Sequence, residues 1–256
     1  MNRKVCLILS GGAARCLAHV GVYRYLFENG YEIEAVAGSS GGSVIGAFIS
    51  SGFLPSQLEY LAKKVKPLRI LRPSFPPKGS LLSWKPVLEF FETFLPERFE
   101  CLKKPLWVSV TDLLEGENVL LNRGNLHLAV AASSALPPFF SPVKIAGRLY
   151  VDGAFTNDLP VEPFGDWDCL KVCSDVTPLY PSSEVSGIFE TTLRALIIAM
   201  RLHKEEKYPL CDVVIKPNLK GLSFVNFKNP EEYFKRGYEA AEEVFKQRNR
   251  GGVENL

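Results

Sequence analysis

The chain has 256 residues, 46% hydrophobic and 23% charged, which is enough to bury a substantial core in one large domain. Thirty basic residues against 28 acidic ones leave a net charge of +2, which argues against a nucleic-acid-binding protein. The apolar run near the N-terminus is too short for a signal peptide, and no other run is long enough to span a bilayer. We therefore expect a cytoplasmic protein.

Strand and helix patterns alternate along the first third of the chain. Residues 5–9 form a continuous apolar run bounded by SGG, which is typical of a strand buried on both faces. The predicted elements that follow are a helix over 13–29 stopped by Gly30, a strand over 33–37, a helix over 42–50 and a helix over 55–64. Four prolines then break any periodicity between residues 65 and 83.

The same alternation continues to the C-terminus. The predicted elements are helices over 84–95, 126–134, 185–203 and 230–247, and strands over 106–110, 118–121, 148–151, 170–173 and 213–215. Such an order indicates βαβ units, so we predict an α/β fold with three α/β/α layers and a mostly parallel central sheet. Residues 1–248 are expected to form a single domain, and residues 249–256 a flexible tail.

The cysteines show no arrangement that indicates a metal site or a redox motif. No CxxC pair is present, and no group of Cys and His completes a zinc set. The six residues are Cys6, Cys16, Cys101, Cys169, Cys173 and Cys211. We expect them to be buried free thiols in a reducing compartment.

The stretch VAGSSGGSVI places two adjacent serines among glycines at the junction of a predicted strand and helix. The pattern G-x-S-x-G requires glycine two residues before and two residues after a nucleophile, because that turn leaves no room for side chains. Ser40 satisfies it with Gly38 and Gly42, whereas Ser39 does not. The alternative is a glycine-rich turn that only allows close helix packing.

A second glycine loop, Ser10-Gly11-Gly12-Ala13, follows the first predicted strand. Its backbone N–H groups can hold an oxyanion or a phosphate. It matches neither GxGxxG nor GxxxxGK[ST], so nucleotide binding is disfavoured. A donor loop and a serine turn at the carboxyl ends of neighbouring strands are the parts needed for acyl transfer.

Two groups are candidates for the base that would serve Ser40. Ser40, Asp152 and His203 stand in α/β-hydrolase order, but that fold has several strands before its serine and only two precede Ser40 here. His203 also lies among charged residues that look like a solvated helix end. Asp152 ends a predicted strand, and a partly desolvated carboxylate can accept the serine proton directly. The alternative role for Asp152 is to cap its own turn.

Taken together, these motifs resemble those of the patatin-like phospholipases. The loop SGGAARC is similar to the family's GGGxRG, although Ala13 and Cys16 stand where glycine is usual. The serine turn matches GxSxG, and the sequence DGA at Asp152 matches DG[GA]. ASSALPPFFSPV, GRLYVDGAFTNDLPV and VSVTDLLEGE also resemble blocks of the family, so the similarity extends from about residue 5 to about residue 163.

The resemblance implies a role for each motif. Ser40 would be the nucleophile and Asp152 its base. The oxyanion hole would consist of the backbone N–H groups of Gly11, Gly12 and Ala13, with Arg15 supporting the loop. The implied reaction is hydrolysis of a lipid ester, in a phospholipid or lysophospholipid, without a metal or organic cofactor. The alternatives are a broad carboxylesterase or thioesterase, and a lipid-binding protein that has kept the fold without the activity.

Basic and apolar residues mix in KKVKPLRILRPSFPPKGSLLSW, residues 63–84. One hypothesis is a lid, or a patch that contacts an anionic membrane surface. The alternative is a connector stiffened by proline, with solvated charges. The sequence gives no indication of the oligomeric state.

Overall fold

The computed structural model describes residues 3–65, 70–75, 79–181 and 185–251 and contains one eight-stranded sheet. The strands are β1 (Lys4–Leu9), β2 (Glu32–Ser39), β3 (Leu106–Asp112), β4 (Asn118–Leu121), β5 (Val143–Ile145), β6 (Arg148–Asp152), β7 (Leu170–Ser174) and β8 (Val213–Ile215). They pair in the sequence β5-β6-β3-β2-β1-β7-β8, and β4 also pairs with β3. β2 and β6 follow each other along one edge of β3, and β4 occupies the other edge. The central strands β3, β2, β1, β7 and β8 are parallel, whereas β4, β5 and β6 run antiparallel to their partners.

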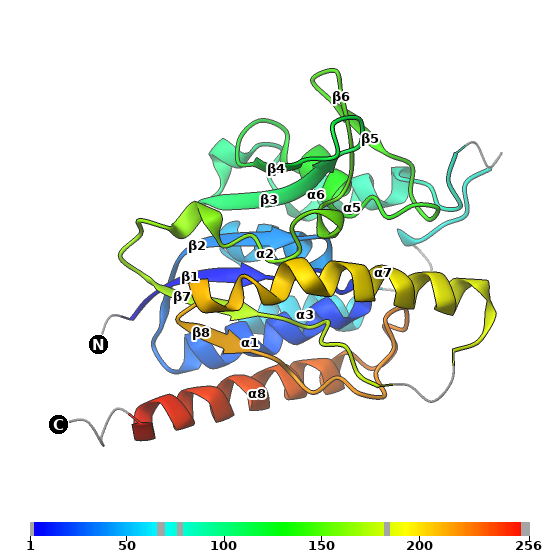
Figure 1. Cartoon of the computed structure of the whole chain (residues 1–256). Helices are drawn as coiled ribbons and strands as arrows, with labels where there is room; N and C mark the ends of the chain where they lie inside the picture. The colour runs from blue at the N-terminus through cyan, green and yellow to red at the C-terminus, as the bar shows by residue number, and fades with distance from the viewer. Residues whose placement is uncertain (1–2, 66–69, 76–78, 182–184, 252–256) are drawn as a thin grey trace.

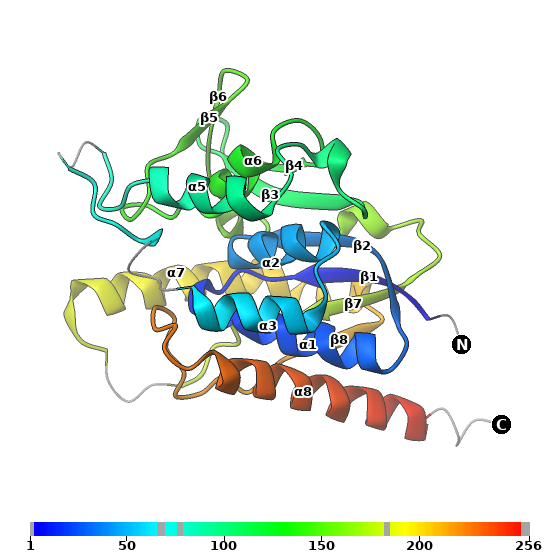
Figure 2. The same cartoon turned by 180° about the vertical axis from the view of Figure 1, so that it is seen from behind.

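Helices and short connecting segments cover both faces of this sheet. The helices are α1 (Leu17–Glu28), α2 (Gly41–Ser50), α3 (Pro55–Lys64), α5 (Lys85–Phe94), α6 (Leu126–Ser133), α7 (Gly187–Glu205) and α8 (Pro230–Gly251). α7 crosses in front of the sheet in Figure 1, whereas α1, α2 and α3 lie in front of it in Figure 2. The three-layer α/β/α arrangement predicted from the sequence is confirmed.

The sheet separates two apolar cores of unequal size. Along β1, Val5, Leu7 and Leu9 face the larger core, which α1, α2 and α8 help to build. Cys6 and Ile8 face a smaller core, which the segment around Leu159 and Phe164 closes. Successive side chains of a strand point to opposite faces, so the continuous apolar run of β1 reflects burial on both sides.

Several elements differ from the sequence-based expectation. The predicted helix over 13–29 begins as a 3-10 turn, Ala13–Cys16, before α1 starts at Leu17. The short edge strand β5 is not predicted, because its Val-Lys-Ile alternation is only three residues long. α8 continues to Gly251 rather than ending at residue 247, because Arg248, Asn249 and Arg250 extend it until the Gly-Gly pair. The remainder of the predicted tail, residues 252–256, lies outside the described residues.

The expectation of free thiols is wrong for four of the six cysteines. Disulfides join Cys6 to Cys169 and Cys173 to Cys211, whereas Cys16 and Cys101 are free. The pairs are 163 and 38 residues apart in sequence. They meet because β7 lies between β1 and β8, an arrangement that cysteine spacing does not reveal.

The described residues leave two questions from the sequence open. Residues 66–69 and 76–78 of the hypothetical lid lie outside them, so the lid and its membrane contact stay predictions. Within the described part of the chain, no helix is both long and apolar enough to cross a membrane. No group of three His, Cys, Asp or Glu side chains placed to hold a metal ion is found among the described residues.

Candidate active site

Ser40 lies in a sharp turn between β2 and α2. Its φ of 48° and ψ of −126° are strained for a residue with a side chain. A Cβ on Gly38 would lie 2.7 Å from the backbone of Gly42, and a Cβ on Gly42 would lie 2.4 Å from the Leu9 carbonyl oxygen. Both contacts are closer than any real Cβ allows, so the turn requires glycine on each side of Ser40.

Strand register brings Asp152 next to Ser40. β3 pairs with β2 through Leu106–Ser109 and with β6 through Val110–Asp112, while β4 pairs with Val108–Thr111. Because a strand has only two edges, β2 and β6 must follow each other along the same edge of β3. Ser39 is opposite Ser109 and Asp152 is opposite Val110, so β2 ends where β6 ends.

The two side chains form a hydrogen bond. Ser40 Oγ donates to Asp152 Oδ2 at 2.7 Å, and the other carboxylate oxygen, Oδ1, accepts from the Ala154 N–H at 2.9 Å. The sequence left two roles for Asp152 open, base for Ser40 and cap of its own turn. The structure shows a hydrogen bond that fits each role, one on each oxygen, and the role of base stays a prediction.

The surroundings of Asp152 raise the pKa of its carboxyl group. The side chain is 3% exposed. Burial raises the pKa of Asp152 to about 7, the nearby charge of Asp158 adds to the rise, and the hydrogen bonds from Ala154 and Ser40 oppose it. A carboxyl with a pKa near 7 is suited to accepting and returning a proton at neutral pH.

Neighbouring serines hold the backbone of Ser40. The Ser40 N–H donates to Ser133 Oγ at 2.8 Å, and that hydroxyl donates in turn to the Ser109 carbonyl at 2.7 Å. Ser43 Oγ donates to the Ser40 carbonyl at 2.7 Å. Ser133, at the end of α6, therefore connects the strained turn to β3. The sequence analysis did not identify this residue.

The glycine loop lies beside the serine turn. A Cβ on Gly11 would lie 3.1 Å from the Cβ of Ser40. The Gly11 N–H donates to Asp158 Oδ1 at 2.7 Å, so this predicted oxyanion donor already has an acceptor. The N–H groups of Gly12 and Ala13 make no hydrogen bond within the described part of the chain. Ala13 adopts a φ of 45°, which glycine would adopt without strain.

Arg15 connects the loop to a segment far along the chain. Its backbone N–H donates to the Gly12 carbonyl at 2.8 Å, which closes the 3-10 turn. Its guanidinium donates to the Leu222 carbonyl through Nε at 3.1 Å and Nη2 at 2.9 Å. Cys16 is buried beneath the serine turn, and burial raises the pKa of its thiol to about 12.

Asp158, which accepts the hydrogen bond from Gly11, belongs to a buried cluster of charged side chains. Lys204 Nζ lies 3.1 Å from Asp158 Oδ2 and 2.7 Å from Asp175 Oδ1, and all three side chains are less than 5% exposed. Lys204 also donates to Thr177 Oγ1, and Tyr208 donates to Asp175 Oδ2 at 2.7 Å. The interpretation of the segment around His203 as a solvated helix end is therefore wrong for Lys204. One face of α7 near its C-terminal end packs inward, which the dense run of charges concealed.

The two histidines with described side chains have structural partners. His19 bridges the Ser174 hydroxyl and the Ser10 carbonyl, and burial lowers its pKa to about 4. His127 bonds to the Leu95 carbonyl. Neither contacts Ser40 or Asp152. The side chain of His203 lies outside the described residues, so the alternative triad stays a prediction.

The family model of the patatin-like phospholipases matches residues 7–164. This match covers more than half of the chain and includes the glycine loop, the serine turn and Asp152. The chain belongs to the patatin-like phospholipase family. The residues of the site that lie after the matched region are Ser174, Asp175, Thr177, Lys204, Tyr208 and Leu222.

Curated relatives include uncharacterised members of the NTE family. One from Mycobacterium bovis is 37% identical over 163 residues, which covers 62% of this chain and 45% of that protein. A second protein of the same organism is 26% identical, over 94% of this chain and 46% of its own length. The chain thus spans about half the length of these relatives. Lysophospholipase NTE1 of Candida glabrata is 23% identical over 92% of this chain and 14% of its own length.

Two solved structures share the fold. VipD of Legionella pneumophila aligns with a TM-score of 0.57 and 14% identity, over 95% of this chain and 67% of that one. The type III effector ExoU aligns with a TM-score of 0.51 and 15% identity, over 96% of this chain and 53% of that one.

Replacing Ser133 by alanine is expected to slow the labelling of Ser40 by a fluorophosphonate about tenfold, because the Ser40 N–H loses its acceptor and the turn loses its fixed geometry. The adjacent Ser134 provides a matched control, since its buried hydroxyl has no hydrogen-bond partner in the described structure. Ser134→Ala should label at the wild-type rate. Equal rates for the two variants would show that Ser133 does not position the nucleophile.

The labelling rate is also expected to rise with pH to a plateau, with its midpoint near pH 7, because only ionised Asp152 can accept the Oγ proton. Asp158→Asn should move this midpoint to lower pH, because it removes a negative charge that raises the pKa of Asp152. The exposed Asp166→Asn is the control and should leave the midpoint unchanged. A rate independent of pH between about 5 and about 9 would contradict the role of Asp152.

Proposed function

We propose that the protein is a serine acyl hydrolase that cleaves the carboxylic ester bonds of lipids, phospholipids or lysophospholipids, through Ser40 and Asp152. The 2.7 Å hydrogen bond from Ser40 Oγ to Asp152 Oδ2, in a chain of the patatin-like phospholipase family, carries the proposal. The curated relative named as a lysophospholipase supports this substrate class.

The first half of the proposed reaction forms an acyl-enzyme. Ser40 Oγ attacks the ester carbonyl carbon while its proton passes to Asp152 Oδ2. The carbonyl oxygen becomes an oxyanion, which the unoccupied N–H groups of Gly12 and Ala13 would stabilise. The N-terminus of α2, which begins directly after Ser40, adds a favourable dipole. When the bond to the leaving oxygen breaks, Asp152 returns its proton to that oxygen.

The second half hydrolyses the acyl-enzyme. Asp152, again ionised, accepts a proton from a water molecule as that water attacks the acyl carbonyl. The second oxyanion collapses, and the proton passes from Asp152 to Ser40 Oγ, which frees the fatty acid. The chemistry in this scheme is carried by these two side chains and by backbone N–H groups.

In wild-type protein we expect a fluorophosphonate to label Ser40 and a lysophospholipid to be hydrolysed. Ser40→Ala should abolish labelling. Asp152→Asn should lower kcat by about three to four orders of magnitude, because the amide cannot accept the serine proton. The measurements are mass spectrometry of the labelled protein and fatty-acid release from 1-palmitoyl-lysophosphatidylcholine.

The controls separate the competing functions. Ser39→Ala, which changes the adjacent buried serine, should label normally. Hydrolysis of p-nitrophenyl acetate without release of palmitate would instead indicate a soluble-ester hydrolase. Equal labelling of wild type and Ser40→Ala, or no labelling of wild type, would overturn the catalytic assignment. Full activity of Asp152→Asn would indicate a different base.

A further inference from the structure

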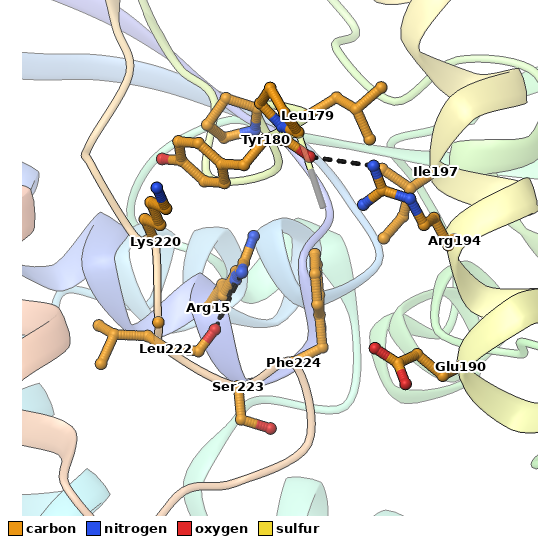
Figure 3. A pocket seen from close by; sticks show the side chains of 13 residues that line it. Arg15, Leu179, Tyr180, Glu190, Arg194, Ile197, Lys220, Leu222, Ser223 and Phe224 are labelled. Carbon is orange, nitrogen blue, oxygen red and sulfur yellow. Dashed lines mark hydrogen bonds between the residues drawn. The ribbon is translucent and has the colours of Figure 1, made fainter. Parts of the chain in front are cut away.

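A cavity of about 450 Å³ lies next to the glycine loop, on the side of β7 and β8. Its walls come from residues 178–181 after β7, from α7, and from residues 220–224 after β8. Figure 3 shows three cationic side chains around it, each from a different part of the chain: Arg15, Arg194 and Lys220. A cavity of this size is in the range that binds small ligands.

Arg15 is a buried cation without an anionic partner. It is 8% exposed, and no carboxylate of the described residues forms a salt bridge with it. Nε and Nη2 donate to the Leu222 carbonyl, and the guanidinium lies 3.8 Å from the centre of the Phe224 ring. Nη1 makes no hydrogen bond within the described structure. Burial lowers the pKa of Arg15, because it disfavours the charged form of the guanidinium.

The other charged groups leave the cavity cationic. Arg194 uses Nη2 to donate to the Tyr180 carbonyl at 3.0 Å. Lys220 Nζ forms no hydrogen bond or salt bridge in the described part of the chain. Among the described residues of the lining, Glu190 is the one acidic side chain, and its Oε2 already accepts from the backbone and side chain of Ser186. Three positive charges thus face a single carboxylate that is engaged elsewhere.

We propose that this cavity binds the phosphate group of a ligand. Arginine and lysine donors that approach from three segments suit a tetrahedral anion, which accepts hydrogen bonds in several directions. Apolar lining residues such as Ile197 and Phe224 would contact the organic part of the ligand.

The cavity and the glycine loop are physically joined. Arg15 stands two residues after Ala13, and the Ala14 N–H donates to the Phe224 carbonyl at 2.8 Å. A phosphate held by Arg15 would therefore be bound by a residue of the same short segment as the proposed oxyanion donors. If the phosphate belongs to a lipid whose ester lies at Ser40, which rests on the proposed function, the cavity would select phosphate-bearing substrates. If it belongs to a free phosphorylated molecule, the cavity would sense that molecule next to the loop.

The lipid source is tested by comparing two substrates that differ by one phosphate, 1-palmitoyl-lysophosphatidate and 1-monopalmitoylglycerol. In Arg194→Gln/Lys220→Gln, kcat/KM for the phosphate-bearing ester is expected to fall at least about tenfold, with little change for the neutral ester. Lys220→Gln alone, which removes no described hydrogen bond, should also lower the ratio of kcat/KM for the phosphate-bearing ester to kcat/KM for the neutral ester. The control is Lys235→Gln/Lys246→Gln, which removes two charges from exposed pairs on α8 and should leave the ratio unchanged.

The free source is tested by calorimetric titration of Ser40→Ala protein with glycerol 3-phosphate and with inorganic phosphate. The site is supported if Ser40→Ala protein binds one of these phosphates and the same protein carrying Arg194→Gln/Lys220→Gln does not. This holds even if the pocket variant does not change the relative kcat/KM of the two esters. This titration does not depend on catalysis. It therefore still tests the phosphate site when wild-type protein hydrolyses neither ester. The proposal is overturned if neither phosphate binds and Arg194→Gln/Lys220→Gln changes kcat/KM for the two esters equally or not at all.

Discussion

The hydrogen bond between Ser40 and Asp152 depends on the way β3 shares one of its edges. β2 pairs with the first half of that edge and the antiparallel β6 with the second, so the ends of the two strands meet and bring together Ser40 and Asp152, which are 112 residues apart in sequence. The turn after β2 and the turn after β6 then face each other. The strain at Ser40, the glycines beside it and the anchoring by Ser133 all maintain this meeting point.

Electrostatics gives the three nearby carboxylates different roles. Lys204 lies between Asp158 and Asp175 and compensates their burial. No cation of the described residues pairs with Asp152, and burial with the charge of Asp158 nearby raises its pKa. Its folded-state pKa lies above its unfolded value. The free energy of unfolding therefore falls as the pH rises from about 4 to about 7, because the carboxyl ionises first in the unfolded chain. Burying Asp152 beside Ser40 therefore lowers the free energy of unfolding at neutral pH and raises the basicity of the carboxylate.

The parts of the site that depend on local rules were predictable. The glycine spacing selected Ser40, because a turn this tight excludes Cβ atoms whatever the surroundings. The spacing around Asp152 did not decide its role, because it also fitted a simple turn cap. Only the family resemblance favoured the role of base. The long apolar runs of β1 and the helical periodicities likewise indicated the layers of the fold, since burial on both faces leaves a direct trace in composition.

The remaining parts depend on contacts between distant segments. Nothing local marks Lys204 as buried, because its neighbours in the sequence are the charged residues of an exposed helix face. Asp158 holds Gly11 from 147 residues away. Each disulfide joins a cysteine on one strand to a cysteine just before the neighbouring strand, and the sequence order does not reveal which strands are neighbours. The short edge strand β5 pairs with β6, and its three residues are too few for their alternation to predict a strand without that partner.

The most direct test of this account is the carboxyl titration of Asp152, followed by nuclear magnetic resonance of aspartate-labelled protein and assigned by Asp152→Asn. In wild-type protein the account predicts a carboxyl with a pKa near 7. In Ser40→Ala that pKa should be higher, because the hydroxyl that stabilises the ionised carboxylate is gone. A carboxyl that titrates near its ordinary value, or one that does not respond to the loss of Ser40, would contradict the account.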